Sequence, residues 1–66
     1  MDILAAMRDA PVSDAHRVIC ARQIEKLVAW EEEPVSKVEW SEDNGIIYFM
    51  AKVGKGTACI GAPKAA

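Results

Sequence analysis

A histidine and two cysteines are the side chains of this sequence best suited to bind a metal. His16 and Cys20 are four residues apart, so a helix would present both on one face. Cys59 could supply a third zinc ligand, but the sequence contains no CxxC pair and no second histidine. The pattern therefore favours a protein without a metal site, and we expect it to use no cofactor.

The same residues are poorly arranged for nucleophilic catalysis. A cysteine nucleophile needs a base beside it, and the only histidine shares a helical turn with Cys20, which belongs to an apolar stripe. Cys20 and Cys59 could form a disulfide in an oxidising compartment, but the N-terminus lacks the features of an export signal. We therefore favour two small buried thiols in a cytoplasmic protein over a disulfide.

Residues 54–57, Gly-Lys-Gly-Thr, match the end of a phosphate-binding loop. The full motif needs a glycine five residues before the Gly-Lys pair and a helix after it. Position 49 is a phenylalanine, and the residues after Thr57 favour a strand, so a tight turn explains both glycines better. The carboxylates lie in charged segments, without the burial that general acid catalysis requires. We expect no catalytic residue and no enzymatic activity.

The charges are distributed unevenly along the 66 residues, whose net charge is −2. Residues 1–30 carry four acidic and four basic side chains, which cancel. Residues 31–43 carry six acids and one lysine, a net charge of −5, whereas the remainder has three lysines and no acid. The acids of this middle block are Glu31, Glu32, Glu33, Glu39, Glu42 and Asp43.

The composition is that of a globular protein, with 52% apolar and 27% charged residues. No apolar run approaches the roughly 18 residues that span a membrane. We expect one domain over residues 1–66, near the size at which a single core is only marginally sufficient.

Two helices are predicted in the N-terminal half. Asp2 is a suitable N-cap for a helix over about residues 2–9, and the chain breaks before Pro11. Ser13 caps a second helix over about residues 14–32, which ends before Pro34. The apolar residues of this helix form a stripe that should face a core, with Ala21 on one side and Ile19 and Trp30 on the other: Cys20, Ile24, Leu27 and Val28.

After Pro34 the apolar pattern changes to the alternation of strands, which we predict over about residues 35–42, 46–53 and 57–61. Asn44-Gly45 is the preferred pair for a two-residue type I′ turn. A hairpin closed there pairs Trp40 with Phe49 and Val38 with Ala51, and the last residues form a frayed tail. The expected fold is α+β, with two N-terminal helices packed on a three-stranded antiparallel β-meander.

The other face of that sheet would expose apolar side chains on its middle strand: Ile46, Tyr48 and Met50. Two explanations remain open. The first helix could cover them with Ile3, Leu4 and Met7, or they could form a contact patch for a partner or a second copy.

The acidic block also has two explanations. Charged edges keep small sheets from pairing with one another, so the carboxylates could serve solubility alone. Alternatively, the glutamates before Pro34 and those of the following strand could form an elongated row that is attracted to a basic groove. Direct binding to nucleic acid is less favoured, because the basic residues are scattered and outnumbered by acids. Three of them could still form a modest basic stripe on the second helix that docks on DNA: Arg17, Arg22 and Lys26.

The acidic block contains the segments EEEP (residues 31–34) and EWSEDNG (residues 39–45). A compact acidic domain with these segments and no catalytic signature resembles the small inhibitors of host machinery encoded by phages and mobile elements, of which anti-CRISPR proteins are the best known group. Many such proteins bind effector complexes and block target DNA, some by presenting carboxylates in place of phosphates. The resemblance concerns size and strategy and assigns no functional residue.

We therefore expect an inhibitor of a host nucleic-acid-handling complex, which occupies a basic, DNA-binding surface with the six acids of residues 31–43. Its partner would be a larger protein or complex, with no nucleic acid or membrane bound directly. We expect a monomer rather than a dimer. The alternative is an oligomerising regulatory or antitoxin-like module that uses Ile46, Tyr48 and Met50.

Overall fold

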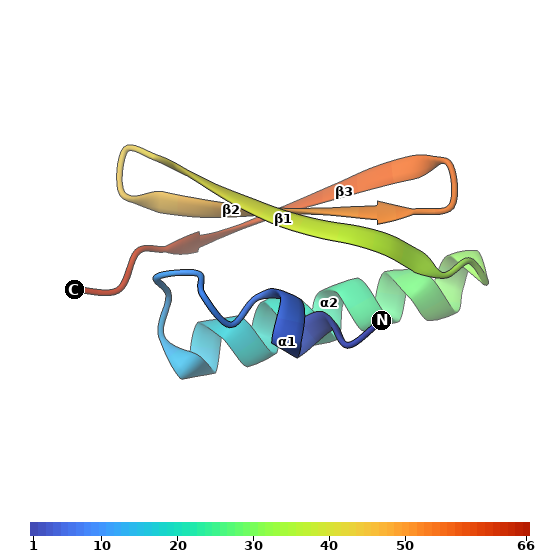
Figure 1. The fold of residues 1–66 in the computed structure, drawn as a ribbon, viewed down its shortest axis with the longest axis horizontal. Helices are drawn as coiled ribbons and strands as arrows, with labels where there is room; N and C mark the ends of the chain where they lie inside the picture. Colours follow the sequence, from blue (N-terminus) through green and yellow to red (C-terminus); the bar gives the residue numbers. More distant parts are fainter.

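The computed structural model describes all residues, Met1–Ala66, as one layer of helices on one layer of sheet (Figure 1). The elements in chain order are α1 (Ile3–Ala6), α2 (Asp14–Glu31), β1 (Val35–Asp43), β2 (Ile46–Val53) and β3 (Gly56–Pro63). The fold is therefore α+β, with two helices before a three-stranded antiparallel meander, as expected. Neither helix combines the length and the apolar character needed to cross a membrane.

Helix α1 is a single turn, shorter than the predicted helix over residues 2–9. The Asp2 carboxylate accepts a hydrogen bond from the Ala5 N–H, so the predicted cap is confirmed. The helix ends because Met7 turns into the core, where it is fully buried. After the helix the Met7 and Ala10 carbonyls accept hydrogen bonds from the N–H groups of Ala10 and Val12, and a side chain from α2 donates to the same carbonyls.

That side chain is Arg17, which holds the α1–α2 connection in place. Its Nε donates to the Met7 carbonyl at 3.2 Å, and its Nη2 donates to the carbonyls of Ala10 and Val12 at 3.0 and 3.1 Å. Its Nη1 pairs with the exposed Asp14 carboxylate at 2.6 Å. A planar guanidinium has enough donors in fixed directions to satisfy these carbonyls together. Arg17 is thus a structural residue and not part of a free basic stripe.

Helix α2 begins and ends close to its predicted bounds. Ser13 Oγ accepts from the His16 N–H at the start, and Glu32 takes a left-handed conformation, with φ of 55°, at the end. The buried residues of α2 are Cys20, Ala21 and Ile24. The expectation that Ile19 and Trp30 flank the core is wrong: they are 51% and 83% exposed, because neither α1 nor the sheet covers their side of the helix.

The predicted hairpin register is confirmed. Asn44 and Gly45 have φ values of 51° and 78°, as a type I′ turn requires, and Trp40 lies opposite Phe49 with Val38 opposite Ala51. An irregularity shifts the pairing between Val35 and Lys37 at the start of β1. The third strand runs from Gly56 to Pro63, longer at both ends than the predicted 57–61.

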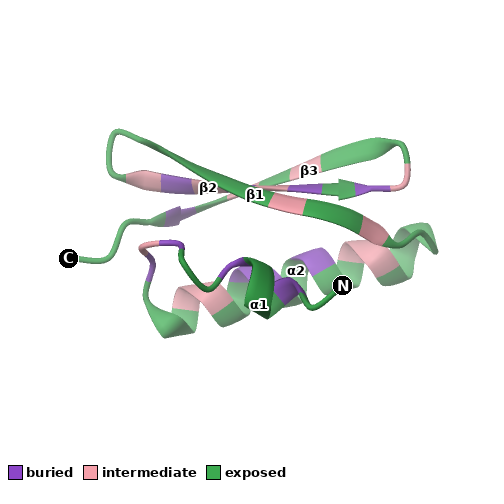
Figure 2. Cartoon of the chain, in the orientation of Figure 1, coloured by how far each residue is buried: buried purple, intermediate pink, exposed green.

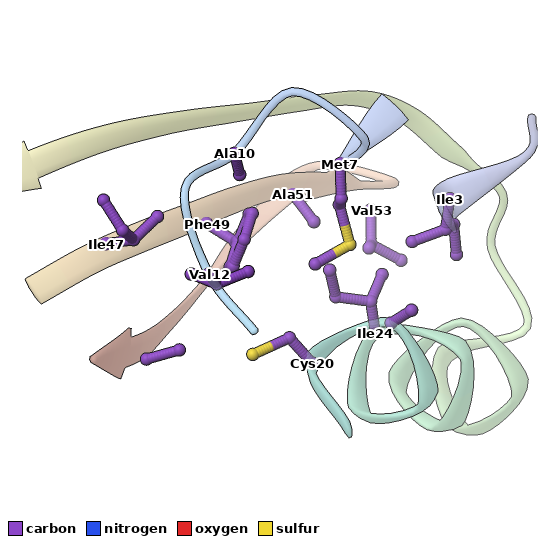
Figure 3. Packing of buried hydrophobic residues seen from close by; sticks show 12 residues of the cluster. Ile3, Met7, Ala10, Val12, Cys20, Ile24, Ile47, Phe49, Ala51 and Val53 are labelled. Atoms are coloured by element: carbon purple, nitrogen blue, oxygen red, sulfur yellow. The ribbon is translucent and has the colours of Figure 1, made fainter. Parts of the chain in front are cut away.

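Both helices lie on the same face of the sheet, and the core fills the space between the layers (Figures 1 and 2). Met7 from the α1 region and Ile24 from α2 meet Val53 and Phe49 of β2 there (Figure 3). Because α1 packs in this layer, it does not cover the opposite face of the sheet. The first of the two explanations for Ile46, Tyr48 and Met50 is therefore wrong, and no helix covers these three half-buried residues.

The C-terminal residues are held in place, so the prediction of a frayed tail is wrong. Ala62 is buried in the core, the Lys64 N–H donates to the Gly45 carbonyl, and the Ala65 N–H donates to the Pro11 carbonyl, both at 2.8 Å. The sequence of small residues gave no indication of these contacts, because both acceptors are distant in the chain and lie in loops.

Candidate functional site

The candidate site is the acidic segment that begins at the end of α2 and follows β1. Glu31, Glu32 and Glu33 are exposed and take part in no ion pair. They lie where the helix dipole presents its negative end, so each carboxylate there costs helix stability, about 0.3–1 kcal/mol at a surface position. Three consecutive residues carry this cost, which distinguishes the C-terminal end of α2 from the rest of the molecule.

Glu33 also packs against the β2–β3 turn. A Cβ atom at Gly54 would lie 3.0 Å from the Glu33 Cγ, and the Gly54 N–H donates to the Pro34 carbonyl at 3.3 Å. Gly54 has a φ of 57°, a conformation that favours glycine. The Gly-Lys-Gly-Thr segment thus closes a hairpin against the end of α2, with a strand after it.

Between α2 and this turn lies an open groove of about 710 Å³. Glu31 and Glu33 line it on one side and Lys55 on the other, above Leu27 and Val53. Sequence reasoning missed this arrangement, because it placed Lys55 in a basic C-terminal block apart from the acids. The proximity follows from the tertiary contact between Glu33 and Gly54, for which the sequence holds no local signal.

The other acids lie along β1 and are partly neutralised. Glu39 pairs with Lys37 at 2.5 Å, and Glu42 pairs with Lys64 at 3.1 Å, whereas Asp43 has no cationic partner. The hydrogen bond from Lys37 to Glu39, with the charge of that carboxylate, raises the pKa of Lys37. Both pairs are exposed to solvent, so they contribute little to stability.

The six acids, which we call the acidic strip, are spread along the end of α2 and the length of β1 and do not form a compact patch. The nine residues of β1 span about 30 Å at about 3.4 Å each, and the molecule is 35 Å long. Glu33 precedes one end of the strand and Asp43 stands at the other (Figure 1). Side chains alternate along a strand, so Glu39 and Asp43 project from the open face of the sheet while Glu42 projects toward the helical layer.

The open face of the sheet lies beside this strip. In the middle row Glu39 of β1 is opposite Met50 of β2, which is opposite Cys59 of β3. A shallow hollow of about 240 Å³ is lined there by Lys37, Glu39, Met50, Lys52 and Thr57. Ile46, Tyr48 and Met50 are therefore placed to form an apolar contact surface with a charged border, as the alternative interpretation requires.

The residues considered for metal binding do not come together. His16 Nδ1 is 2.8 Å from Ser13 Oγ at the start of α2, and Cys20 is buried between the layers, where desolvation raises its pKa. Cys59 is exposed on the opposite face of the sheet, so the prediction of two buried thiols is wrong for this residue. The sheet separates the two free cysteines, which precludes a disulfide within one chain.

No family model, no curated protein and no solved structure matches this chain. The assignment of the candidate site therefore rests on the sequence and structure of this chain alone.

Proposed function

We propose that this protein is a small, non-enzymatic binding protein whose acidic strip contacts a basic surface of a larger partner. The observation that supports this most is the group of three exposed glutamates at the end of α2, which have no ion-pair partner and oppose the helix dipole. A sequence under selection for stability alone would place basic residues there. A partner with cationic side chains would relieve the repulsion.

The partner we propose is a nucleic-acid-handling complex of a host cell, inhibited as anti-CRISPR proteins of phages inhibit their targets. Surfaces that bind nucleic acid are rich in lysine and arginine, and complementary charge increases the rate of association with an acidic strip. Occupation of that surface would block the nucleic acid without any catalytic residue.

The density of carboxylates along the strip limits how closely the protein can imitate DNA. A DNA duplex carries one negative charge per about 1.7 Å of its axis, or roughly 18 charges over a 30 Å length. The strip has six carboxylates, and two of them pair with lysines of the same chain. We therefore propose occupation of a local basic patch, and not the imitation of a whole duplex.

Substitutions of the carboxylates test this proposal. Replacing Glu31, Glu32 and Glu33 by Gln should weaken binding to the partner, and the loss should be greater at low salt, because screening already weakens the attraction at high salt. The same variant should be slightly more stable than wild type, because it removes charges unfavourable to the helix dipole. Loss of binding could then not be ascribed to unfolding.

A control variant removes acidic charge outside residues 31–43. Asp9→Asn with Glu25→Gln changes two exposed acids that do not belong to the acidic block of residues 31–43, and it should leave binding unchanged. Equal weakening by this control and by the glutamate variant would show that net charge, and not the strip, determines binding. Wild-type affinity after all six acids of the strip are replaced would overturn the proposal.

A second candidate function is an oligomerising regulatory or antitoxin-like module. The observation that favours it is the uncovered sheet face, on which Ile46, Tyr48 and Met50 remain partly exposed. Met50→Lys would place a charge in the centre of that face. If the module assembles through this surface, the variant should sediment as a monomer at concentrations at which the wild type is a dimer.

A further inference from the structure

The two edges of the sheet differ in their protection against strand pairing. β1 carries four charged side chains near its edge, Lys37, Glu39, Glu42 and Asp43, and a pairing irregularity at its start. Both features discourage another strand from adding to an edge. β3 is also an edge strand, but its eight residues, Gly56–Pro63, include no charged side chain.

The unpaired backbone groups of β3 can be assigned to individual residues. β3 bonds to β2 on one side only, so alternate residues direct their N–H and C=O groups away from the sheet. Val53 and Gly56 flank the two-residue turn and form the first pair of the ladder. Residues alternate along β3 from this pair, so the N–H and C=O groups of Thr57, Cys59 and Gly61 point away from β2. All three residues are exposed.

Two large apolar side chains of α2, Ile19 and Trp30, are exposed on the same side of the molecule. With the polar Gln23 between them they are spaced by four and seven residues, so the three form one row along the helix. Trp30 follows Leu27 by three residues, and Leu27 lines the groove beside Gly56 and Thr57 of β3. Helix α1 packs on the other side of α2, beneath β1 (Figure 1). Ile19 and Trp30 therefore point away from α1, to the side of the free β3 edge.

We infer that a second copy of this chain pairs antiparallel with β3, so that two three-stranded sheets become one six-stranded sheet. This departs from the monomer expected from the sequence. An antiparallel pair of identical strands is self-complementary about a two-fold axis. The short side chains of β3 permit close approach of the two backbones, and Ile19 and Trp30 on the adjacent side of α2 would gain partners by the same two-fold operation.

The spacing of the layers fits this assembly. Neighbouring strands lie about 4.8 Å apart, and α2 packs beneath β2 and β3. Two copies joined at β3 would place their α2 helices two to three strand spacings apart, roughly 10–14 Å. Helices in contact lie about 8–10 Å apart, so large side chains are needed to fill the remaining gap. The antiparallel arrangement directs Ile19 of each copy toward Trp30 of the other, and these side chains fill it.

The register between the two β3 strands follows from the backbone groups that point away from β2. With the two-fold axis at Cys59, Thr57 of each copy lies opposite Gly61 of the other, and every residue in these pairs has an N–H to donate. The two β1 strands become the outer edges of the six-stranded sheet. The acidic strips thus remain free, so this inference does not depend on the proposed function.

Sedimentation of the purified chain at 10–100 µM tests the inference. The wild type should form a dimer of twice the 7.2 kDa chain mass. Cys59→Lys places like charges opposite each other on the two β3 strands, and Trp30→Ala removes the largest apolar side chain of the helix contact. Each should raise the dimer dissociation constant at least about tenfold. Both positions are exposed in the single chain, so folding should be retained.

Met50→Lys is the matched control, because Met50 lies directly beside Cys59 but on the middle strand. It should leave a dimer joined at the β3 edge intact. A wild type that is monomeric at 100 µM, a dimer insensitive to Cys59→Lys or Trp30→Ala, or a dimer abolished by Met50→Lys would each overturn the inference.

Oxidative cross-linking tests the register. Directly paired residues in an antiparallel ladder have Cα atoms about 5.5 Å apart, within the range that a disulfide spans. Diamide should therefore join two chains through Cys59, with the loss of two thiol protons and two electrons to the reagent. The cross-link should be absent in Cys59→Ser and retained in Cys20→Ala. A wild-type dimer that does not cross-link would overturn the register centred on Cys59.

Discussion

Replacement of Arg17 by alanine should remove the most extensive side-chain hydrogen bonding in the molecule. Its guanidinium donates to the carbonyls of Met7, Ala10 and Val12, and its side chain is only 19% exposed. Met7, Ala10 and Val12 all contribute to the core. The loss would therefore affect both the α1–α2 connection and the packing of α1 beneath β1.

The size of the effect can be worked from these bonds. A hydrogen bond to a charged group contributes about 1.5–3 kcal/mol net. Three of them would give about 4.5 kcal/mol at the low end. Part of this would be recovered, because the Met7 and Ala10 carbonyls keep their backbone N–H donors and water can enter the vacated site. The Asp14 pair adds nothing to this figure, since that carboxylate is 97% exposed. We expect a loss of about 3 kcal/mol in the free energy of unfolding.

For a chain of this length each kcal/mol changes the melting temperature by about 4–8 °C, so Arg17→Ala should melt about 12–24 °C below wild type. Circular dichroism should be used, because Trp30 and Trp40 are 83% and 39% exposed and report poorly on the core. Arg17→Lys should recover only part of the loss, because an ammonium lacks the planar donor arrangement. Arg22→Ala, an exposed change on the same helix, should cost less than about 0.5 kcal/mol. Equal, small losses in Arg17→Ala and Arg22→Ala would refute this reasoning.

Three further changes test other parts of the structure by denaturation or thiol chemistry. Gly54→Ala should lower the free energy of unfolding by about 1–2 kcal/mol, because alanine would be held at a positive φ and its Cβ would press on Glu33. An unchanged free energy of unfolding would show that the turn adapts to the new side chain. Deletion of residues 64–66 removes two backbone hydrogen bonds and should cost about 1–3 kcal/mol, whereas a truly frayed tail would cost nothing. Burial raises the pKa of Cys20, so the unfolded thiol ionises first and stability should fall as pH rises above the ordinary value of 9.0. Cys20 should also react with a thiol reagent far more slowly than exposed Cys59. Equal reaction rates, or a loss of stability above pH 9.0 that is the same with and without Cys20, would contradict its burial.

The elements of the fold followed from the sequence where the signals were local. Asn44-Gly45 determined the turn and hence the pairing of Trp40 with Phe49, and the caps at Asp2 and Ser13 determined the helix starts. The face on which α1 packs could not be predicted in this way. Ile3 and Met7 can cover either side of a sheet equally well, and the face they take depends on tertiary contacts such as the hydrogen bond from Arg17 to the Met7 carbonyl.

The candidate site was predictable in composition but not in arrangement. The sequence identified the acids from Glu31 to Asp43, while their separation along a nine-residue strand and the pairing of Glu42 with Lys64 depend on tertiary structure. The exposure of Trp30 was missed for a related reason. The periodicity of a helix places a residue on one side of it, but it does not show how wide the covering sheet is.

The proposed function is tested most directly by a paired capture experiment from a lysate of the host cell. Wild-type protein and the variant with all six acids of the strip replaced by Gln or Asn would be immobilised in equal amounts, and the bound proteins compared by quantitative mass spectrometry. We expect a nucleic-acid-handling protein with a basic surface to be enriched on the wild type, to be lost from the variant, and to be displaced by added DNA. Recovery of the same proteins in the same amounts on both would contradict the assignment of the acidic strip as the binding surface.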